Sequence, residues 1–324
     1  MGVNGLLPTL RVHAIDPEPD GPQWLVQDLW GACAVGVIGG APKACKSMMG
    51  LDLAISVASA TPCLDRFEVH TPGPVLVYLA EDALPRVRDR VAQLCLHRGL
   101  SLQSLNLHVV TAPSLRLDLE RDQHALDQTL AEIQPRLLLL DPLVRLHRLD
   151  ENSAADVSGL LGFLRHINRR HQLALVLVHH MAKRSRRDLG QALRGSSDLH
   201  AWTDSACYLV RRNDQRLQLT VEHRSAPAPD PVLLRLISGD GEPLRLLIDS
   251  DEVPPLPLAV AIRYELRRSP QPVSRTALRR LLRVNNARLG EALQTLEKRC
   301  LVVHSSDGWH LPPEHDSSQT DLFS

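Results

Sequence analysis

Two glycines, two lysines and a serine, residue types that bind phosphate, gather in one short stretch of the chain. The stretch reads Gly39-Gly40-Ala41-Pro42-Lys43-Ala44-Cys45-Lys46-Ser47. An apolar run precedes it at residues 34–38 and an apolar-periodic segment follows at 48–59, which predicts a strand, a loop and a helix. A phosphate-binding loop in that setting has the pattern G-x-x-x-x-G-K-[ST]. Gly40, Lys46 and Ser47 match its spacing, and Cys45 stands where the pattern has glycine.

In such a loop the backbone N–H groups and the positive end of the helix dipole bind the phosphates. We therefore predict ATP and Mg²⁺ as the cofactors of residues 40–47. Lys46 would bind the β- and γ-phosphates, Ser47 would ligate Mg²⁺, and Lys43 would add a second positive charge. The ordinary alternative is a tight turn with a solvated lysine, but the position between a buried strand and a helix favours phosphate.

Cys45 is the departure from the pattern. Glycine tolerates a positive φ freely, whereas a residue with a Cβ adopts one at a cost. We expect nucleotide binding to survive, with the loop slightly distorted. The alternative is a redox-sensitive site, because a helix N-terminus lowers the pKa of a thiol.

Three further predicted strands end in side chains that could do chemistry. Glu81 and Asp82 follow residues 75–79, Asp141 follows 137–140, and His179 and His180 follow 173–178. In open α/β sheets, ligands bind beyond the carboxyl ends of the strands, so we expect these side chains beside the glycine-rich loop. The ordinary alternatives are helix-capping acids, a turn residue before Pro142 and structural histidines.

Each of these residues has a predicted role. Glu81 would be the general base that orients the attacking water, and Asp141 would hold Mg²⁺ directly or through water. One of the two histidines would sense hydrolysis at the γ-phosphate. Two adjacent histidines could also suggest a metal site, but no third ligand is evident in the sequence. Arg194 is predicted to enter a neighbouring subunit's site, as an arginine finger does.

Composition narrows the class of protein. The chain has 324 residues, of which 44% are hydrophobic and 23% charged, enough to bury a core. The formal net charge is zero, so it neither supports nor excludes a nucleic-acid partner. The six cysteines are scattered, which predicts neither a zinc site nor disulfides and favours a cytoplasmic location. We see no signal peptide, and no apolar run reaches the ~20 residues of a membrane span.

Continuous apolar strands that alternate with helices predict an α/β fold with a mostly parallel sheet. From residue 206 onward, strands joined by polar turns are expected to extend the sheet in antiparallel fashion. The predicted organisation is an arm at 1–22, an ATPase domain at 23–249, a linker at 250–257, a winged-helix-like domain at 258–313 and a disordered tail at 314–324.

Taken in order, these segments resemble the RecA-type hexameric ATPases of the plasmid RepA replicative-helicase kind, relatives of the DnaB-like helicases. The resemblance spans roughly residues 25–240. It rests on residues 40–47, 78–82, 138–143, His147 with 150–152, 178–183 and 194–197.

The resemblance implies a role for each matching residue. Lys46 and Ser47 would be the Walker A residues, Glu81 the catalytic carboxylate and Asp141 the Walker B acid. His179 would be a sensor, and Arg194 the finger given to the adjacent subunit. The sensor would face a DNA-binding loop that contains Lys183, Arg184, Arg186 and Arg187.

The function we expect is an ATP-hydrolysing, DNA-associated ring, by resemblance a hexamer, that acts on single-stranded DNA as a replicative helicase or translocase. One alternative is an ATP-switched regulator of a plasmid or mobile element, and another is an interaction scaffold that has lost catalysis. The C-terminal domain lies outside the resemblance, and its arginines favour duplex DNA as a partner, with a protein as the alternative.

Overall fold

The computed structural model describes most of the chain. The described residues are 9–17, 21, 23–149, 154–180, 197–212, 216–239, 242–249, 258, 262–263, 265–266, 269, 271–282, 284, 286–298, 301–306 and 308–312. The chain divides into two compact units, Met1–Asp249 and Ser250–Ser324, which are described separately below. Among the described residues, no helix has the length and apolar character needed to cross a membrane.

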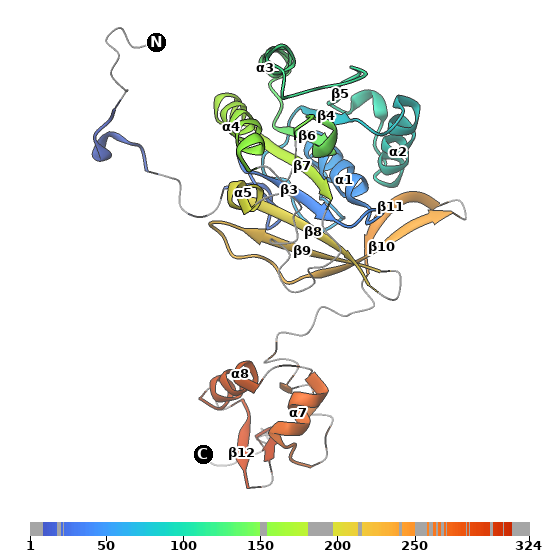
Figure 1. Ribbon diagram of the computed structural model, residues 1–324. Helices are drawn as coiled ribbons and strands as arrows, with labels where there is room; N and C mark the ends of the chain where they lie inside the picture. The colour runs from blue at the N-terminus through green and yellow to red at the C-terminus, as the bar shows by residue number, and fades with distance from the viewer. Residues whose placement is uncertain are drawn as a thin grey trace, which may run out of the picture. The chain divides into compact units, whose positions relative to one another are not determined.

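A nine-stranded sheet organises the first unit (Figure 1). Its strands lie in the order β11-β10-β9-β8-β3-β7-β6-β4-β5, so β3, which leads into the glycine-rich loop, is central. In chain order they are β3 (Val35–Gly40), β4 (Val75–Leu79), β5 (Leu107–Val109), β6 (Leu137–Asp141), β7 (Ala174–His180), β8 (Ser205–Arg211), β9 (Leu217–His223), β10 (Val232–Gly239) and β11 (Glu242–Ile248).

The six strands from β3 to β8 are parallel, and β9, β10 and β11 continue the sheet in antiparallel fashion. The predicted α/β class with a mostly parallel sheet is therefore confirmed. The expectation that the antiparallel part begins at residue 206 is wrong by one strand, because β8 pairs parallel with β3. A short helix that we did not predict, α5 (Ser197–Trp202), precedes β8. The consecutive parallel strands β7 and β8 need a crossover connection of this kind, and β3 lies between them in the sheet.

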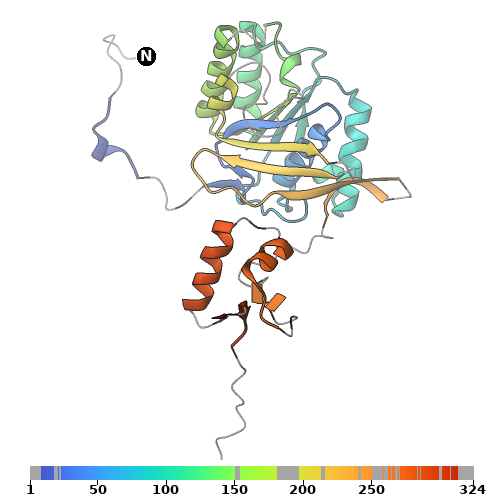
Figure 2. The ribbon, with the colours of Figure 1, turned by 60° about the horizontal axis from the view of Figure 1, so that its bottom comes forward.

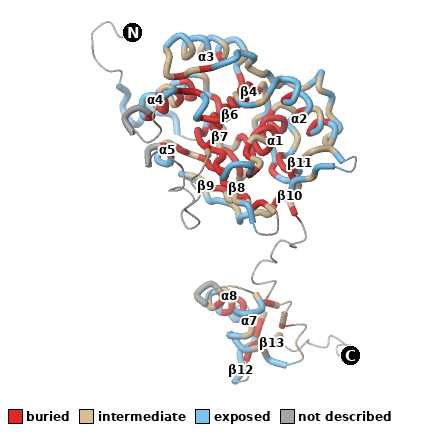
Figure 3. The backbone as a smooth tube through the Cα atoms, turned by 45° about the vertical axis from the view of Figure 1, so that its right-hand side comes forward, coloured by how far each residue is buried: buried red, intermediate tan, exposed pale blue. Residues whose placement is uncertain are grey.

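Helices cover both faces of the sheet and form two separate cores (Figures 1 and 3). On one face pack α1 (Lys46–Ser59) and α2 (Leu84–His97). On the other pack α3 (Glu120–Ile133), α4 (Ala154–His171) and α5. The central strands are buried along their length because both of their faces are covered, which explains their unbroken apolar sequences.

Smaller elements complete the first unit. They are the hairpin β1 (Trp24–Val26) and β2 (Trp30–Gly31), and three 3₁₀ helices, η1 (Val12–Ala14), η2 (Leu102–Ser104) and η3 (Leu143–Arg145). The last of these follows β6 directly and carries Arg145 close to the carboxyl end of the sheet.

The second unit, whose ribbon is drawn in Figures 1 and 2, has its own apolar core. Its described elements are α7 (Arg275–Leu282), α8 (Asn286–Lys298), β12 (Val303–Ser305) and β13 (Gly308–His310). Residues 262–263 and 265–266 are also helical. Ser274 Oγ accepts a hydrogen bond of 3.2 Å from the N–H of Ala277, the helix cap predicted from the sequence. The winged-helix assignment stays a prediction.

Candidate functional site

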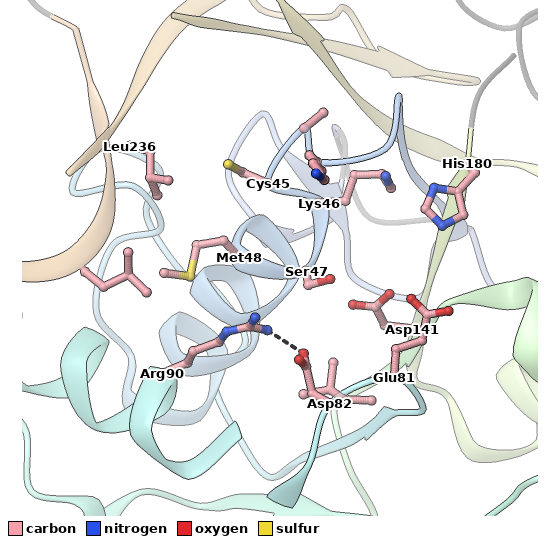
Figure 4. A pocket seen from close by; sticks show the side chains of 14 residues that line it. Cys45, Lys46, Ser47, Met48, Glu81, Asp82, Arg90, Asp141, His180 and Leu236 are labelled. Atoms are coloured by element: carbon pink, nitrogen blue, oxygen red, sulfur yellow. Dashed lines mark hydrogen bonds and ion pairs between the residues drawn. The ribbon is translucent and has the colours of Figure 1, made fainter. Parts of the chain in front are cut away.

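A cleft of about 380 Å³ opens at the carboxyl ends of the central strands (Figure 4). Its walls come from the glycine-rich loop, the start of α1, the ends of β4, β6 and β7, helix α2 and the hairpin of β10 and β11. The lining residues are Lys43, Ala44, Cys45, Lys46, Ser47, Met48, Leu79, Glu81, Asp82, Arg90, Asp141, His180, Leu236 and Leu244. The predicted meeting of the loop with acids from two other strand ends therefore occurs.

The alternation of side chains along a strand explains which residues reach this cleft. In β6, Leu137 and Leu139 belong to the core under α1, so Asp141 points to the same side. Leu79 at the end of β4 also belongs to that core, and Glu81 follows it by one further alternation. The face of the sheet that packs on α1 is thus the face that supplies the carboxylates.

The same alternation separates the two histidines. Val178 of β7 lies in the core under α1, and His180, two residues later, lines the cleft. His179 is buried and, by alternation, lies on the opposite side of the sheet, toward the core that contains Leu177. The structure therefore brings His180 into the candidate site and leaves His179, the histidine chosen by resemblance, outside the cleft.

Lys46 is the first residue of α1, and its side chain is buried in the loop. Its ammonium donates a hydrogen bond of 2.9 Å to the carbonyl oxygen of Ala41, within the same loop. Burial lowers the pKa of Lys46, and the nearby charge of Asp141 partly offsets this effect. A buried ammonium at the start of a helix is placed to bind an anion that reaches the loop.

Cys45 adopts φ 58° and ψ 26°, the left-handed region. The sequence predicted this conformation, because the motif normally has glycine here, and a residue with a Cβ holds it at a cost of about 1 kcal/mol or more. Gly40, at the other end of the loop, cannot be replaced so easily. A Cβ there would lie 2.7 Å from the carbonyl oxygen of Leu209 on β8.

Burial raises the pKa of the Cys45 thiol, and the positive charges of Arg211 and Lys46 offset only part of the rise. The alternative of a redox-sensitive site requires a lowered thiol pKa. That alternative stays a prediction, and burial of the thiol at the start of α1 works against it.

Asp141 is a buried carboxyl group beside the loop. Burial raises its pKa to about 6, against the opposing effects of a hydrogen bond with Ser47 and the charge of Lys46. A hydroxyl and a carboxylate joined in this way are oxygen ligands of the kind that Mg²⁺ prefers, and Mg²⁺ in nucleotide sites uses few protein ligands besides phosphates and water. Among the described residues, no group of three or more His, Cys, Asp or Glu is placed to hold a metal. The pair of Ser47 and Asp141 thus fits a magnesium–phosphate complex.

The two acids after β4 have different partners. Glu81 Oε1 accepts a bond of 2.9 Å from Arg145 Nε, and both side chains are about half exposed. Asp82 forms an ion pair with Arg90 of α2 (Figure 4). The alternative that Asp82 caps α2 is wrong, since Ala83 occupies the N-cap position and no side chain caps that helix end.

Several residues of the site escaped the sequence reasoning. Arg211, at the end of β8, donates a hydrogen bond of 2.9 Å to the carbonyl oxygen of Lys43 and so joins that strand to the loop. Its alternation with Leu209, a residue of the core under α1, is a signal that could have indicated it. Leu236 and Leu244 reach the cleft from the antiparallel hairpin and, with Met48, make that end of it apolar.

The predicted DNA-binding residues Lys183, Arg184, Arg186 and Arg187 lie outside the described residues, as does Arg194. Residues 150–152 of the resemblance also lie outside them.

A protein-family model described as an AAA domain matches residues 5–186 of the chain. Two solved structures are similar in fold. The RadB recombinase has a TM-score of 0.48 and 16% identity, over 64% of this chain and 88% of that one. The ATPase domain of G40P has a TM-score of 0.49 and 14% identity, over 64% of this chain and 82% of that one. At these values, the two likenesses carry no conclusion about function.

Proposed function

The chain belongs to the AAA domain family, and we propose that it is an ATPase whose reaction takes place in the cleft beside the glycine-rich loop. The observation that carries this proposal is the convergence of Lys46 and Ser47 with the carboxylates of Asp141 and Glu81, from three different strand ends, around one cavity. The ordinary alternative, a tight turn with a solvated lysine, would not explain why side chains from three strand ends meet at this cavity.

The residues divide the reaction between them. Lys46 and the N–H groups of the loop bind the phosphates, and Ser47 and Asp141 hold Mg²⁺, which when bound neutralises charge on the β- and γ-phosphates. Glu81 accepts a proton from water as the water oxygen attacks the γ-phosphorus. The bond from that phosphorus to the β–γ bridging oxygen breaks, and ADP and inorganic phosphate are released.

The apolar end of the cleft fits the nucleobase. Met48, Leu236 and Leu244 offer apolar contact there, and Arg90 adds a guanidinium held by Asp82. A base has a polar edge and an apolar face, so this wall gives contact to the face. The cleft thus has a charged end for the phosphates and an apolar end for the base.

The test of the phosphate assignment is Lys46→Ala. Loss of a preorganised cation that contacts the reacting group costs about a hundredfold or more in turnover, so ATP hydrolysis should fall to background. Lys298→Ala, in the second unit, removes the same charge without touching the cleft and should keep normal turnover. If Lys46→Ala hydrolyses ATP as fast as the parent protein, the assignment of the loop is wrong.

The finer proposal is a RepA-like hexameric helicase or translocase that acts on single-stranded DNA. Its support is the ordered set of motifs from residue 40 to residue 197. In this proposal Arg194 serves the adjacent subunit, His179 or His180 senses hydrolysis, and the basic residues at 183–187 contact DNA. An Arg194→Ala chain mixed with a Lys46→Ala chain should then recover part of the ATPase activity, and no recovery would argue against shared sites.

The second unit supports one rival. Arg275, Arg279 and Arg280 are exposed on α7, which suits a regulator that binds duplex DNA, or an acidic protein, under the control of ATP. Strand displacement on a forked DNA distinguishes the two functions. A helicase separates the strands in an ATP-dependent manner, whereas a switch binds the fork and leaves it paired.

A further inference from the structure

Glu81 lies in the wall between two cavities. The first is the cleft described above, and the second, of about 310 Å³, is lined by Tyr78, Ala80, Glu81, Pro113, Ser114, Arg116 and Arg145. The ion pair between Glu81 Oε1 and Arg145 Nε, 2.9 Å long, belongs to this wall. The general base of the proposed reaction is therefore held by a residue of the neighbouring cavity.

The second cavity is built to attract an anion. It contains two guanidinium groups and one carboxylate. Arg116 Nη1 donates bonds of 2.7 Å to the carbonyl oxygen of Arg145 and 3.2 Å to that of His147. Carbonyl oxygens carry no formal charge, so these bonds position Arg116 and fix the backbone of Arg145 without neutralising either guanidinium.

The ion pair can be broken by a stronger partner. The side chain of Arg145 is 59% exposed and that of Glu81 49% exposed, and solvent-exposed pairs of this kind contribute little to stability. A phosphate diester offers two oxygens to a guanidinium in a planar, charge-assisted arrangement. A phosphate in the cavity would therefore compete with Glu81 for Arg145 and would also bind Arg116.

The pairing matters for the reaction, because a carboxylate that accepts a bond from a guanidinium is a poorer acceptor for the proton of water. We propose that the second cavity binds a phosphate of a single-stranded nucleic-acid backbone. Its occupancy draws Arg145 away from Glu81 and frees Glu81 to act as the base. Pro113 and Ser114 on the rim are exposed, so a continuous strand can reach the cavity. The inference rests on the proposed function, since it needs Glu81 as the base.

The test is steady-state ATP hydrolysis by the full chain, with and without a single-stranded oligothymidylate. The parent protein should be stimulated by the oligonucleotide. Arg145→Ala should be faster without it, by about fivefold if the lost pair is of ordinary exposed strength, and should gain little more when it is added. Arg145→Gln should show the same changes in ATPase rate as Arg145→Ala. This second variant controls for any effect that alanine itself has on the structure of η3.

The matched control is Arg148→Ala. Arg148 is an exposed arginine on the same segment, but it pairs with Asp118 at 3.1 Å and does not line the second cavity. Its removal should leave both the basal rate and the stimulation at the parent values. Arg116→Ala should raise the oligonucleotide concentration that gives half of the maximal stimulation. Inorganic phosphate at the same phosphate concentration lacks the neighbouring phosphates of a continuous strand, so it should bind more weakly and stimulate far less. Equal stimulation would overturn the assignment to nucleic acid.

Other outcomes overturn the inference. If Arg145→Ala slows hydrolysis both with and without the oligonucleotide, Arg145 assists the reaction directly and does not restrain Glu81. If the oligonucleotide leaves the rate of the parent protein unchanged, the coupling is absent, while the Lys46→Ala test of the phosphate loop stands independently. If Glu81→Gln retains normal turnover, it is the proposed role of Glu81 itself that fails.

Discussion

At the scale of single residues, Cys45 is the clearest case of a local conformation that overrides residue preference. The loop needs a left-handed residue before Lys46, and the chain supplies a cysteine at φ 58°. Its side chain packs against the core under α1, and that contact offsets part of the backbone strain. The sequence pattern alone predicted the strain, but not the packing that accompanies it.

We predict that Cys45→Gly relieves this strain and changes the nucleotide site. Relief of the strain should raise the free energy of unfolding by about 1 kcal/mol, less the contribution of the lost thiol contact. A change of about 1 kcal/mol shifts the melting temperature by about 2–4 °C in a domain of this size. Nucleotide affinity and turnover should rise, because the loop can then adopt its preferred geometry. Calorimetry and steady-state kinetics measure the two effects.

Ala60→Gly is the matched control for this prediction. Ala60 caps the far end of α1, is exposed, and adopts nearly the same conformation at φ 58° and ψ 24°. Its replacement should raise the melting temperature with no change in nucleotide affinity. If both variants change nucleotide affinity equally, the effect does not come from the loop.

Asp141 gives the site a predicted pH dependence. Its folded-state pKa of about 6 lies above the ordinary 3.8, so the folded protein binds a proton more readily than the unfolded chain. Its contribution to stability is therefore largest at low pH and declines as pH rises from about 4 to about 6. Metal binding has the opposite sign, because Mg²⁺ needs the carboxylate.

We therefore expect the apparent affinity for Mg²⁺ with ATP to fall as pH drops below about 6, by about tenfold per pH unit. Titrations of ATPase activity with Mg²⁺ at several pH values measure this effect. In Asp141→Asn, Mg²⁺ affinity should be weak, and its remaining pH dependence should be that of the ATP phosphates alone. A parent protein whose Mg²⁺ affinity stays constant from pH 7 to pH 5 would contradict the role given to Asp141.

At the scale of elements, the strands of the parallel sheet were the most predictable part of the fold. Residues 75–79 and 137–140 are unbroken apolar runs, and both are strands within one residue of the predicted ends. The pairing of β8 was missed because the six-residue α5 is too short to show a helical period. The apolar wall of the cleft was missed because it depends on where the β10–β11 hairpin comes to lie, and such long-range packing leaves no local pattern.

Arg211 provides a prediction at this scale, because it joins β8 to the loop through the carbonyl of Lys43. Arg211→Ala should weaken nucleotide binding about fivefold, the effect of losing a hydrogen bond of roughly 1 kcal/mol, with a smaller effect on turnover. Arg212→Ala, at the adjacent exposed position, should bind nucleotide normally. Fluorescent-nucleotide titration measures both, and equal losses in the two variants would point to general surface charge instead.

At the scale of the whole molecule, two units with separate cores share one chain. The first carries every described residue of the candidate site, and the family match at 5–186 falls within it. The composition of residues 250–257 predicted a linker between two domains, since prolines and acids cluster there. The partner of the second unit was not predictable in the same way, because an exposed basic helix suits both nucleic acid and acidic proteins.

The position of Glu81 between two cavities has a consequence for how much ATP the protein would consume when no nucleic acid is bound. ATP is abundant in cells at all times, so an ATPase of the proposed kind that hydrolysed it at full rate would consume ATP without useful work whenever no nucleic acid was bound. Under the proposed arrangement, the Glu81–Arg145 pair keeps hydrolysis slow until a bound nucleic-acid strand separates the two side chains. Because an exposed ion pair is weak, this restraint is incomplete, and a slow basal hydrolysis of ATP remains. That slow loss of ATP is the consequence of a restraint weak enough for a single phosphate to release.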